Sequence, residues 1–248
     1  ENMYKISEFD FLNDFNEFSY TNNFTFYSTA FPKETLNKKF LYYLEDIKYL
    51  IFIENHDYNI AAIITTPDVA EKIKKKYNIV LSNNPEELYF LIHNNLKNKK
   101  EIKTIIGKNC KISDLSKIET NNVKIGNNVC IEEFVSIKEN VEIGDNTLIK
   151  AGTIIGGEGF HVFKQNGIPT MVKHHGSVKI GDNVTIGSNC TIDKGMWPHV
   201  STILENNVKT DNKVHIGHNA KIKENVRLAA GTTLSGYCII GKNTFCGV

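Results

Sequence analysis

Six histidines in the second half of the 248-residue chain are the side chains best suited to acid–base chemistry. They are His161, His174, His175, His199, His215 and His218. An unperturbed imidazole has a pKa of about 6.5, so it can accept a proton from a reacting group near neutral pH. Two of the six lie in one short segment, His215-Ile216-Gly217-His218-Asn219. Which of them can act as a general base depends on the elements that hold them.

Those elements follow from a repeat of six residues. Aliphatic or small residues recur at Ile125, Ile131, Ile137, Ile143, Ile149, Ile155, Ile180, Ile186, Ile192, Leu204, Thr210, Ile216, Ile222, Leu228, Leu234, Ile240 and Cys246. A six-residue period fits neither an α-helix nor an amphipathic strand. It is typical of a chain that runs one short strand, turns a corner and repeats. Three sides then close an 18-residue coil, and coils stack by parallel strand pairing around a continuous aliphatic core.

Two interruptions break the period. Residues 156–177 lack it, and we expect them to form an extended loop with a functional role. The segment from Met196 to His199 carries the only tryptophan, Trp197. A corner packed against a neighbouring chain and a ring that stacks on a ligand are both open for Trp197. An earlier series, Ile106, Ile112 and Ile118, keeps the spacing one residue out of phase.

Residues 1–100 lack the six-residue repeat, and their alternating strand and helix signals predict a small α/β domain. Segments rich in β-branched and aromatic residues predict strands at 24–27, 49–53, 61–65 and 78–81. Thr66 and Asn84 are the expected N-caps of two helices, over 67–73 and up to Leu96. The boundary falls at the charged run 97–101, so the repeat domain covers 101–248.

The 18-residue coil gives His218 a specific neighbour. His218 follows the inward Ile216 by two residues and lies near a corner, and Gly236 is its equivalent on the next coil. A glycine there leaves space above the base and a backbone N–H that can hold a developing oxyanion. A lone histidine on such a coil is more often a surface or interface residue, so this reading needs support from its context.

Composition excludes several other classes. The 29 Lys and Arg against 28 Asp and Glu give a net charge of +1, so we expect no nucleic-acid partner. No apolar run is long enough for a transmembrane segment, and no secretory signal is visible at residue 1. The five cysteines form no CxxC pair, which favours reduced thiols in a cytoplasmic protein and no bound metal.

Three segments of the repeat carry a family resemblance. They are residues 155–160 (IGGEGF), 187–195 (GSNCTIDKG) and 211–219 (DNKVHIGHN). Residues 156–246 resemble the UDP-3-O-acylglucosamine N-acyltransferases of the lipid A pathway. The resemblance implies a left-handed parallel β-helix, assembled as a homotrimer with active sites between subunits. It also implies that His218 is the catalytic base.

A weaker resemblance covers residues 41–49 (LYYLEDIKY), which match the uridine-binding stretch of that family. Tyr43 and Tyr49 are aromatics able to stack on a flat ring. Asp46 replaces the usual Asn, and a carboxylate cannot donate a hydrogen bond as an amide can. An ordinary role for both tyrosines as half-buried strand residues is equally open.

The reaction expected from the resemblance is transfer of an acyl group from a phosphopantetheine thioester to an amine on a nucleotide-linked sugar. The thioester, carried by acyl-carrier protein or CoA, is a co-substrate, and no tightly bound cofactor or metal is required. His218 would accept the amine proton, and Gly236 N–H would stabilise the oxyanion. Substrate contacts are expected from Gly157, Glu158, Phe160, Asp211, Asn212 and His215.

Three alternatives remain. An acetyl-CoA-dependent N- or O-acetyltransferase for a surface glycan keeps the chemistry and changes the substrates. A zinc hydratase on the same coil would need about three well-placed histidines, and no suitably spaced pair stands out. A structural or ice-binding solenoid predicts an uninterrupted flat face, which the loop at 156–177 and the N-terminal domain argue against.

Overall fold

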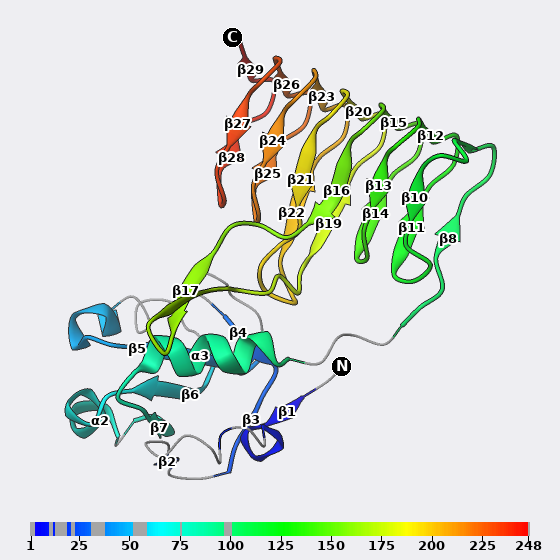
Figure 1. Ribbon diagram of the computed structural model, residues 1–248. Coiled ribbons are helices and arrows are strands. Elements are labelled where there is room, and N and C mark those ends of the chain that lie inside the picture. Colours follow the sequence, from blue (N-terminus) through cyan, green and yellow to red (C-terminus); the bar gives the residue numbers. More distant parts are fainter. Residues whose placement is uncertain are drawn as a thin grey trace. The chain divides into compact units, whose positions relative to one another are not determined.

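The computed structural model describes residues 3–9, 12, 19–20, 23–30, 38–51, 59–74, 76–96 and 101–247 (Figure 1). The chain forms two compact units. The first comprises residues 1–99 together with 160–173, and the second comprises 100–159 and 174–248. Residues 160–173 of the predicted loop are therefore part of the first unit, while both ends of that loop belong to the second.

The first unit is built on a five-stranded sheet with the order β2-β7-β6-β5-β4. Its strands are β2 (Ser19–Tyr20), β4 (Ser28–Thr29), β5 (Phe40–Leu44), β6 (Ile60–Thr65) and β7 (Ile79–Leu81). Neighbouring strands pair in parallel except β2, which is antiparallel to β7. Helices α2 (Pro67–Ile73) and α3 (Pro85–Asn94) connect to this sheet, and β1 (Tyr4–Lys5) pairs separately with β3 (Thr25–Phe26).

The predicted elements of this unit need two corrections. The predicted strand at 49–53 is wrong at its start, because Ile47–Tyr49 form the 3-10 helix η3 and Asp46 caps it; residues 52 and 53 lie outside the described residues. The strand in this part of the chain is β5, which precedes η3 and is buried nearly throughout. Thr66 occupies the N-cap of α2 without a side-chain capping bond, whereas the Asn84 side chain accepts a hydrogen bond from Glu87 N.

Residues 160–173 fold as the antiparallel hairpin β17 (Val162–Gln165) and β18 (Ile168–Met171) and pack on α3 (Figure 1). The Phe163 ring lies 5.5 Å from that of Phe90, and Phe163 is buried. Asn94 accepts a hydrogen bond from Lys173 N at 2.8 Å, and Glu87 accepts one from Asn166 N at 2.9 Å. The excursion therefore completes the first unit, because it packs on α3 at Phe90.

The second unit is a left-handed parallel β-helix with three sheets, as predicted. One sheet contains β10 (Lys117–Ile118), β13 (Ser136–Ile137), β16 (Ile154–Gly157), β21 (Thr191–Asp193), β24 (His215–Ile216) and β27 (Thr233–Leu234). The second contains β8 (Ile105–Ile106), β11 (Val123–Ile125), β14 (Val141–Ile143), β19 (Ser177–Ile180), β22 (Ser201–Leu204), β25 (Lys221–Ile222) and β28 (Ile239–Ile240). The third contains β9 (Lys111–Ile112), β12 (Cys130–Ile131), β15 (Leu148–Ile149), β20 (Thr185–Ile186), β23 (Lys209–Thr210), β26 (Arg227–Leu228) and β29 (Phe245–Cys246).

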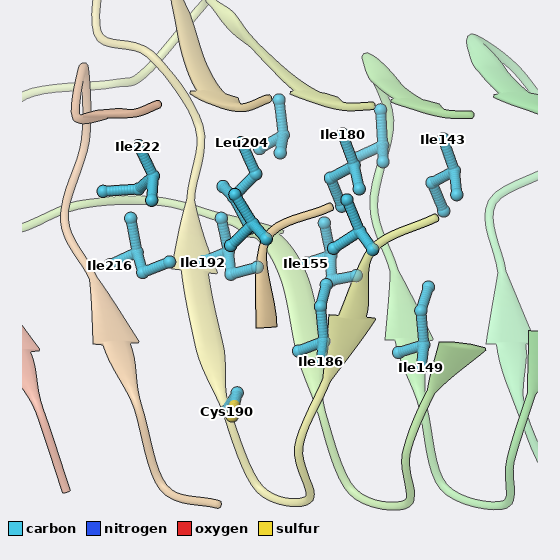
Figure 2. Close-up of a cluster of buried hydrophobic side chains, with 14 of the residues drawn as sticks. Ile143, Ile149, Ile155, Ile180, Ile186, Cys190, Ile192, Leu204, Ile216 and Ile222 are labelled. Carbon is cyan, nitrogen blue, oxygen red and sulfur yellow. The ribbon is translucent and has the colours of Figure 1, made fainter. Parts of the chain in front are cut away.

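The repeated aliphatics point inward and stack from coil to coil (Figure 2). Ile155, Ile192 and Ile216 align by strand register and are at most 1% exposed. Burying each such side chain contributes about 1.5–3 kcal/mol, so the column is the main source of stability in this unit. At the corners, left-handed backbone is occupied mostly by asparagine, which tolerates positive φ better than most side chains.

Coil length explains two departures from strict spacing, namely the shifted phase of the series before Ile125 and the break at Trp197. The first coil has one extra residue, because Ile106 pairs with Ile125 and Ile112 with Ile131. Thr191 pairs with His215, 24 residues further on, so the segment with Trp197 adds one full period and the phase resumes unchanged. Trp197 is fully buried within its own chain, and this corrects both roles considered for it.

No helix among the described residues is both long and apolar enough to cross a membrane. All five cysteines are free thiols, and only Cys190 is buried in the β-helix core.

Candidate functional site

His218 lies in the corner that follows β24, and its ring contacts Asn219, which is itself held by Met196. Its Nδ1 is 3.4 Å from Oδ1 of Asn219, and that oxygen also accepts a hydrogen bond from Met196 N at 2.8 Å. Because Asn219 Oδ1 is an acceptor, Nδ1 of His218 carries the hydrogen. Nε2 is then the nitrogen with a lone pair available to accept a proton.

Gly236 stands directly against that nitrogen. The register of β24 with β27 stacks the two corners, and Tyr237 N donates to the His218 carbonyl at 2.9 Å. A Cβ atom added to Gly236 would lie 2.6 Å from Nε2 of His218. Only glycine therefore leaves the space beside Nε2 that a reacting group needs.

Aromatic rings and a second glycine enclose the rest of the His218 side chain. His174 lies edge-to-face at 5.1 Å between ring centroids, and Tyr237 does the same at 5.4 Å. Trp197 Nε1 donates to the Tyr237 hydroxyl at 3.2 Å, which holds that ring in place. A Cβ on Gly159 would come within 2.9 Å of both imidazoles. These neighbours leave His218 half-buried.

Burial lowers the pKa of His218 below its ordinary value, because desolvation disfavours the imidazolium; the bond to Asn219 opposes this with a smaller effect. The shift favours the neutral imidazole over the imidazolium. A neutral, oriented imidazole with a free Nε2 is the form that a general base requires.

Two further ionisable side chains, Asp193 and His215, lie together on the outer face of the sheet that contains β24. Ile192 and Ile216 point inward, so their neighbours Asp193 and His215 point outward by alternation. Oδ2 of Asp193 is 3.8 Å from Nε2 of His215, and Nδ1 of His215 is 2.8 Å from the Thr191 hydroxyl. Burial raises the pKa of Asp193 to about 6, against a smaller lowering effect of His215. Asp193 thus binds and releases protons near neutral pH.

The start of the 156–177 loop adjoins this pair. The ladder shifts register between Ile155 and Gly157, at Gly156 with φ +85°, and this brings Gly157 opposite Asp193. Glu158 Oε1 is 3.5 Å from Nζ of Lys194. The predicted contact residue Gly157 therefore lies beside Asp193, and Glu158 lies beside Lys194.

Asp211 and Asn212 occupy the corner at the opposite end of β24 from His218. Oδ1 of Asn212 accepts from Ser188 N at 2.8 Å and caps the coil below, while Asp211 Oδ1 accepts from Asn212 N at 2.7 Å. Within the chain, the structure does not bring this pair next to His218. Their contact with substrate stays a prediction.

The uridine-site candidates lie in the first unit. Tyr43 on β5 packs 4.8 Å from the Tyr89 ring, and burial raises its pKa to about 12. Asp46 accepts from Lys48 N at 2.9 Å and forms an exposed ion pair with the Lys48 ammonium. Tyr49 is half exposed, and Phe160, also in this unit, is 84% exposed. Nucleotide binding by these residues also stays a prediction.

Among the described residues, no three His, Cys, Asp or Glu side chains gather as a metal site.

Sequence reasoning did not select Asn219, Tyr237, Asp193 or the ring contact of His174. Asn219 and Tyr237 are 18 residues apart, and this spacing indicates that they occupy equivalent corners of neighbouring coils. Both adopt positive φ. Asp193 alternates with the inward Ile192, and that pattern places it on the outer face. Nothing in the period marks His174, which arrives from the end of the loop.

Comparison with known proteins supports the repeat assignment. The family model described as bacterial transferase hexapeptide (six repeats) matches residues 122–157 and 201–236. The model described as hexapeptide repeat of succinyl-transferase matches residues 177–212.

The same region is similar to UDP-3-O-acylglucosamine N-acyltransferases. The protein of that name from Maricaulis maris is 48% identical over 88 residues, covering 36% of this chain and 25% of the relative. The one from Rickettsia akari is 44% identical over 94 residues, covering 38% and 27%. The resemblance seen in the sequence is confirmed. The matches span about a quarter of the length of these relatives.

One solved structure supports the fold in the same way. The UDP-N-acetylglucosamine acyltransferase from Bacteroides fragilis is 28% identical, with a TM-score of 0.51, and covers 60% of this chain and 54% of that one.

Proposed function

We propose that this protein is an acyltransferase that moves an acyl group from a pantetheine thioester to the amine of a UDP-linked amino sugar. The observation that carries the proposal is the His218 corner, where a neutral imidazole presents Nε2 to a space kept open by Gly236. Similarity to UDP-3-O-acylglucosamine N-acyltransferases supports the nucleotide sugar as acceptor.

The proposed mechanism uses both residues. The amine nitrogen attacks the thioester carbonyl, and His218 Nε2 accepts the proton that the nitrogen loses. Gly236 N–H donates to the oxyanion of the tetrahedral intermediate, a role that contributes roughly 3 kcal/mol in other acyl transfers. The imidazolium then protonates the departing thiolate, and the base is regenerated. Acyl-carrier protein and CoA carry the same thioester group, so either can be the donor.

The substrate-side assignments belong to the same proposal. His215 orients the sugar beside Gly157 and Glu158, and Tyr43 and Tyr49 hold the uracil ring. A homotrimer would complete sites that need residues of neighbouring subunits, such as Asp211 and Asn212.

The test offers acyl-carrier-protein and CoA thioesters to the purified protein with a panel of UDP-linked amino sugars. We expect His218→Ala to lower kcat by about 10²–10⁴-fold, the usual contribution of a general base. Lys124→Ala is the control, since Lys124 is exposed on β11 in a different sheet from β24. Full activity of His218→Ala would remove the base assignment.

Transfer to a hydroxyl is a second candidate. The similar Bacteroides fragilis structure is named for UDP-N-acetylglucosamine, a sugar whose nitrogen is already acylated. Including that sugar in the acceptor panel separates the two candidates.

A further inference from the structure

Acylation of an amine releases one more proton than acylation of a hydroxyl. An amine whose carbon bears polar neighbours, such as a peptide α-amino group, has a pKa of about 8 and is mostly ammonium at pH 7. When R–NH₃⁺ becomes an amide, two N–H bonds break. One proton ends on the thiol through His218. The second must leave before nitrogen can attack, because an ammonium has no lone pair.

Asp193 is placed to receive that second proton. It lies on the outer face of β21, where Gly157 faces its carboxylate, and Gly159, two residues further along the chain, lies against His218. Its side chain is 14% exposed, so it is largely shielded yet open to a bound group. Gly157 opposite it carries no side chain that would cover the carboxylate.

The groups around Asp193 leave its carboxylate available. His215 from β24 lies 3.8 Å away, and its Nδ1 is engaged with Thr191. Lys194, which follows Asp193, is 3.5 Å from Glu158 on the loop after β16. Burial of His218 lowers its pKa and so favours its neutral form. No fixed positive charge in this set is committed to Asp193.

We propose that Asp193 binds the acceptor as an ammonium and takes its first proton, which prepares the amine for attack. In this step an N–H bond of R–NH₃⁺ breaks and an O–H bond forms on the carboxylate, giving R–NH₂ and a neutral carboxylic acid. The acid then loses its proton to water. The pKa of Asp193, raised by burial to about 6, brings it closer to that of the ammonium than an ordinary aspartate would be. The inference rests on the proposed function and narrows its acceptor to an amine.

The test compares wild type with Asp193→Asn in acyl transfer to UDP-linked amino sugars between pH 6 and 9. We expect kcat/KM of Asp193→Asn to fall about tenfold or more at pH 6.5 and to recover to within about threefold at pH 9, where solvent has already deprotonated the amine. Asp193→Glu should restore part of the activity at pH 6.5. Asp114→Asn, an exposed carboxylate in the first coil, is the matched control and should behave as wild type. Thermal unfolding confirms that each variant is folded.

Four results would overturn the inference. A deficit of Asp193→Asn that is equal at every pH indicates a binding or structural role. No deficit at pH 6.5 removes Asp193 from the reaction. Wild-type protein that acylates hydroxyls but no amine removes the amine acceptor while acyl transfer stands. If wild type acylates nothing in the panel, the proposed function fails, and the inference with it.

Discussion

Nε2 of His218 lies so close to Gly236 that a single added carbon at Gly236 would approach it to 2.6 Å. The first prediction follows from this contact. Gly236→Ala should displace the imidazole or fill the space beside it, and kcat should fall by about 10²-fold or more. Gly241→Ala is the control, because its added Cβ meets only Thr244 Oγ1 at 3.8 Å. Equal activities of the two variants would show that the space at Gly236 is not used.

Asn219 should control the ionisation of His218. Asn219→Asp keeps the acceptor oxygen but adds a negative charge beside Nδ1, which favours imidazolium and raises the pKa of His218. The fall in kcat/KM on the acid side should therefore begin at a higher pH in the variant than in wild type. Measuring kcat/KM from pH 5 to 9 in both proteins checks this. If the acid side of the kcat/KM profile does not move, Asn219 does not influence the pKa of His218.

Asn219→Gly is a complementary variant. It removes the oxygen that holds Nδ1 yet suits the positive φ of 61° at this corner. We expect kcat to fall about tenfold, and stability to fall by about 1–3 kcal/mol because the buried Met196 N–H loses its acceptor. Unchanged kcat in a folded, destabilised variant would assign Asn219 a structural role only.

Asp193 should make stability fall as pH rises. Its folded-state pKa is raised from 3.8 to about 6, so between these values the folded chain binds more protons than the unfolded chain. The free energy of unfolding therefore decreases from pH 4 to 6 on this account. Asp193→Asn removes the penalty, and at pH 7.5 it should stabilise the fold by about 1–3 kcal/mol. Denaturation at pH 4 and pH 7.5 measures it, and a stabilisation equal at both values would contradict it.

Truncating an inward-facing side chain of the β-helix should destabilise the fold more than truncating an exposed one. Ile192 is 1% exposed and lies between Ile155 and Ile216 in the sheet. Ile192→Ala should cost about 2–5 kcal/mol, because the coils on both sides hold the cavity open. Ile239→Ala, at a position 65% exposed, should change stability by less than about 1 kcal/mol. Chemical denaturation of the two variants compares them.

The sequence alone determined the β-helix and the pairing of His218 with Gly236. Both follow from spacing, because each coil contacts only its neighbours and a fixed period sets which residues stack. The same locality explains why the phase survives Trp197, since the added segment equals one period. Helix α3 was likewise readable from its cap at Asn84.

Only the tertiary structure decided what surrounds the base. Asn219 orients His218 through an oxygen that Met196 holds, and Met196 belongs to the added segment rather than to the period. His174 reaches the same corner from the end of a long excursion, whose hairpin packs on α3. The degree of burial that shifts the pKa of Asp193 also depends on neighbours distant in sequence. Spacing specifies which backbones stack, but long-range contacts place the side chains between them.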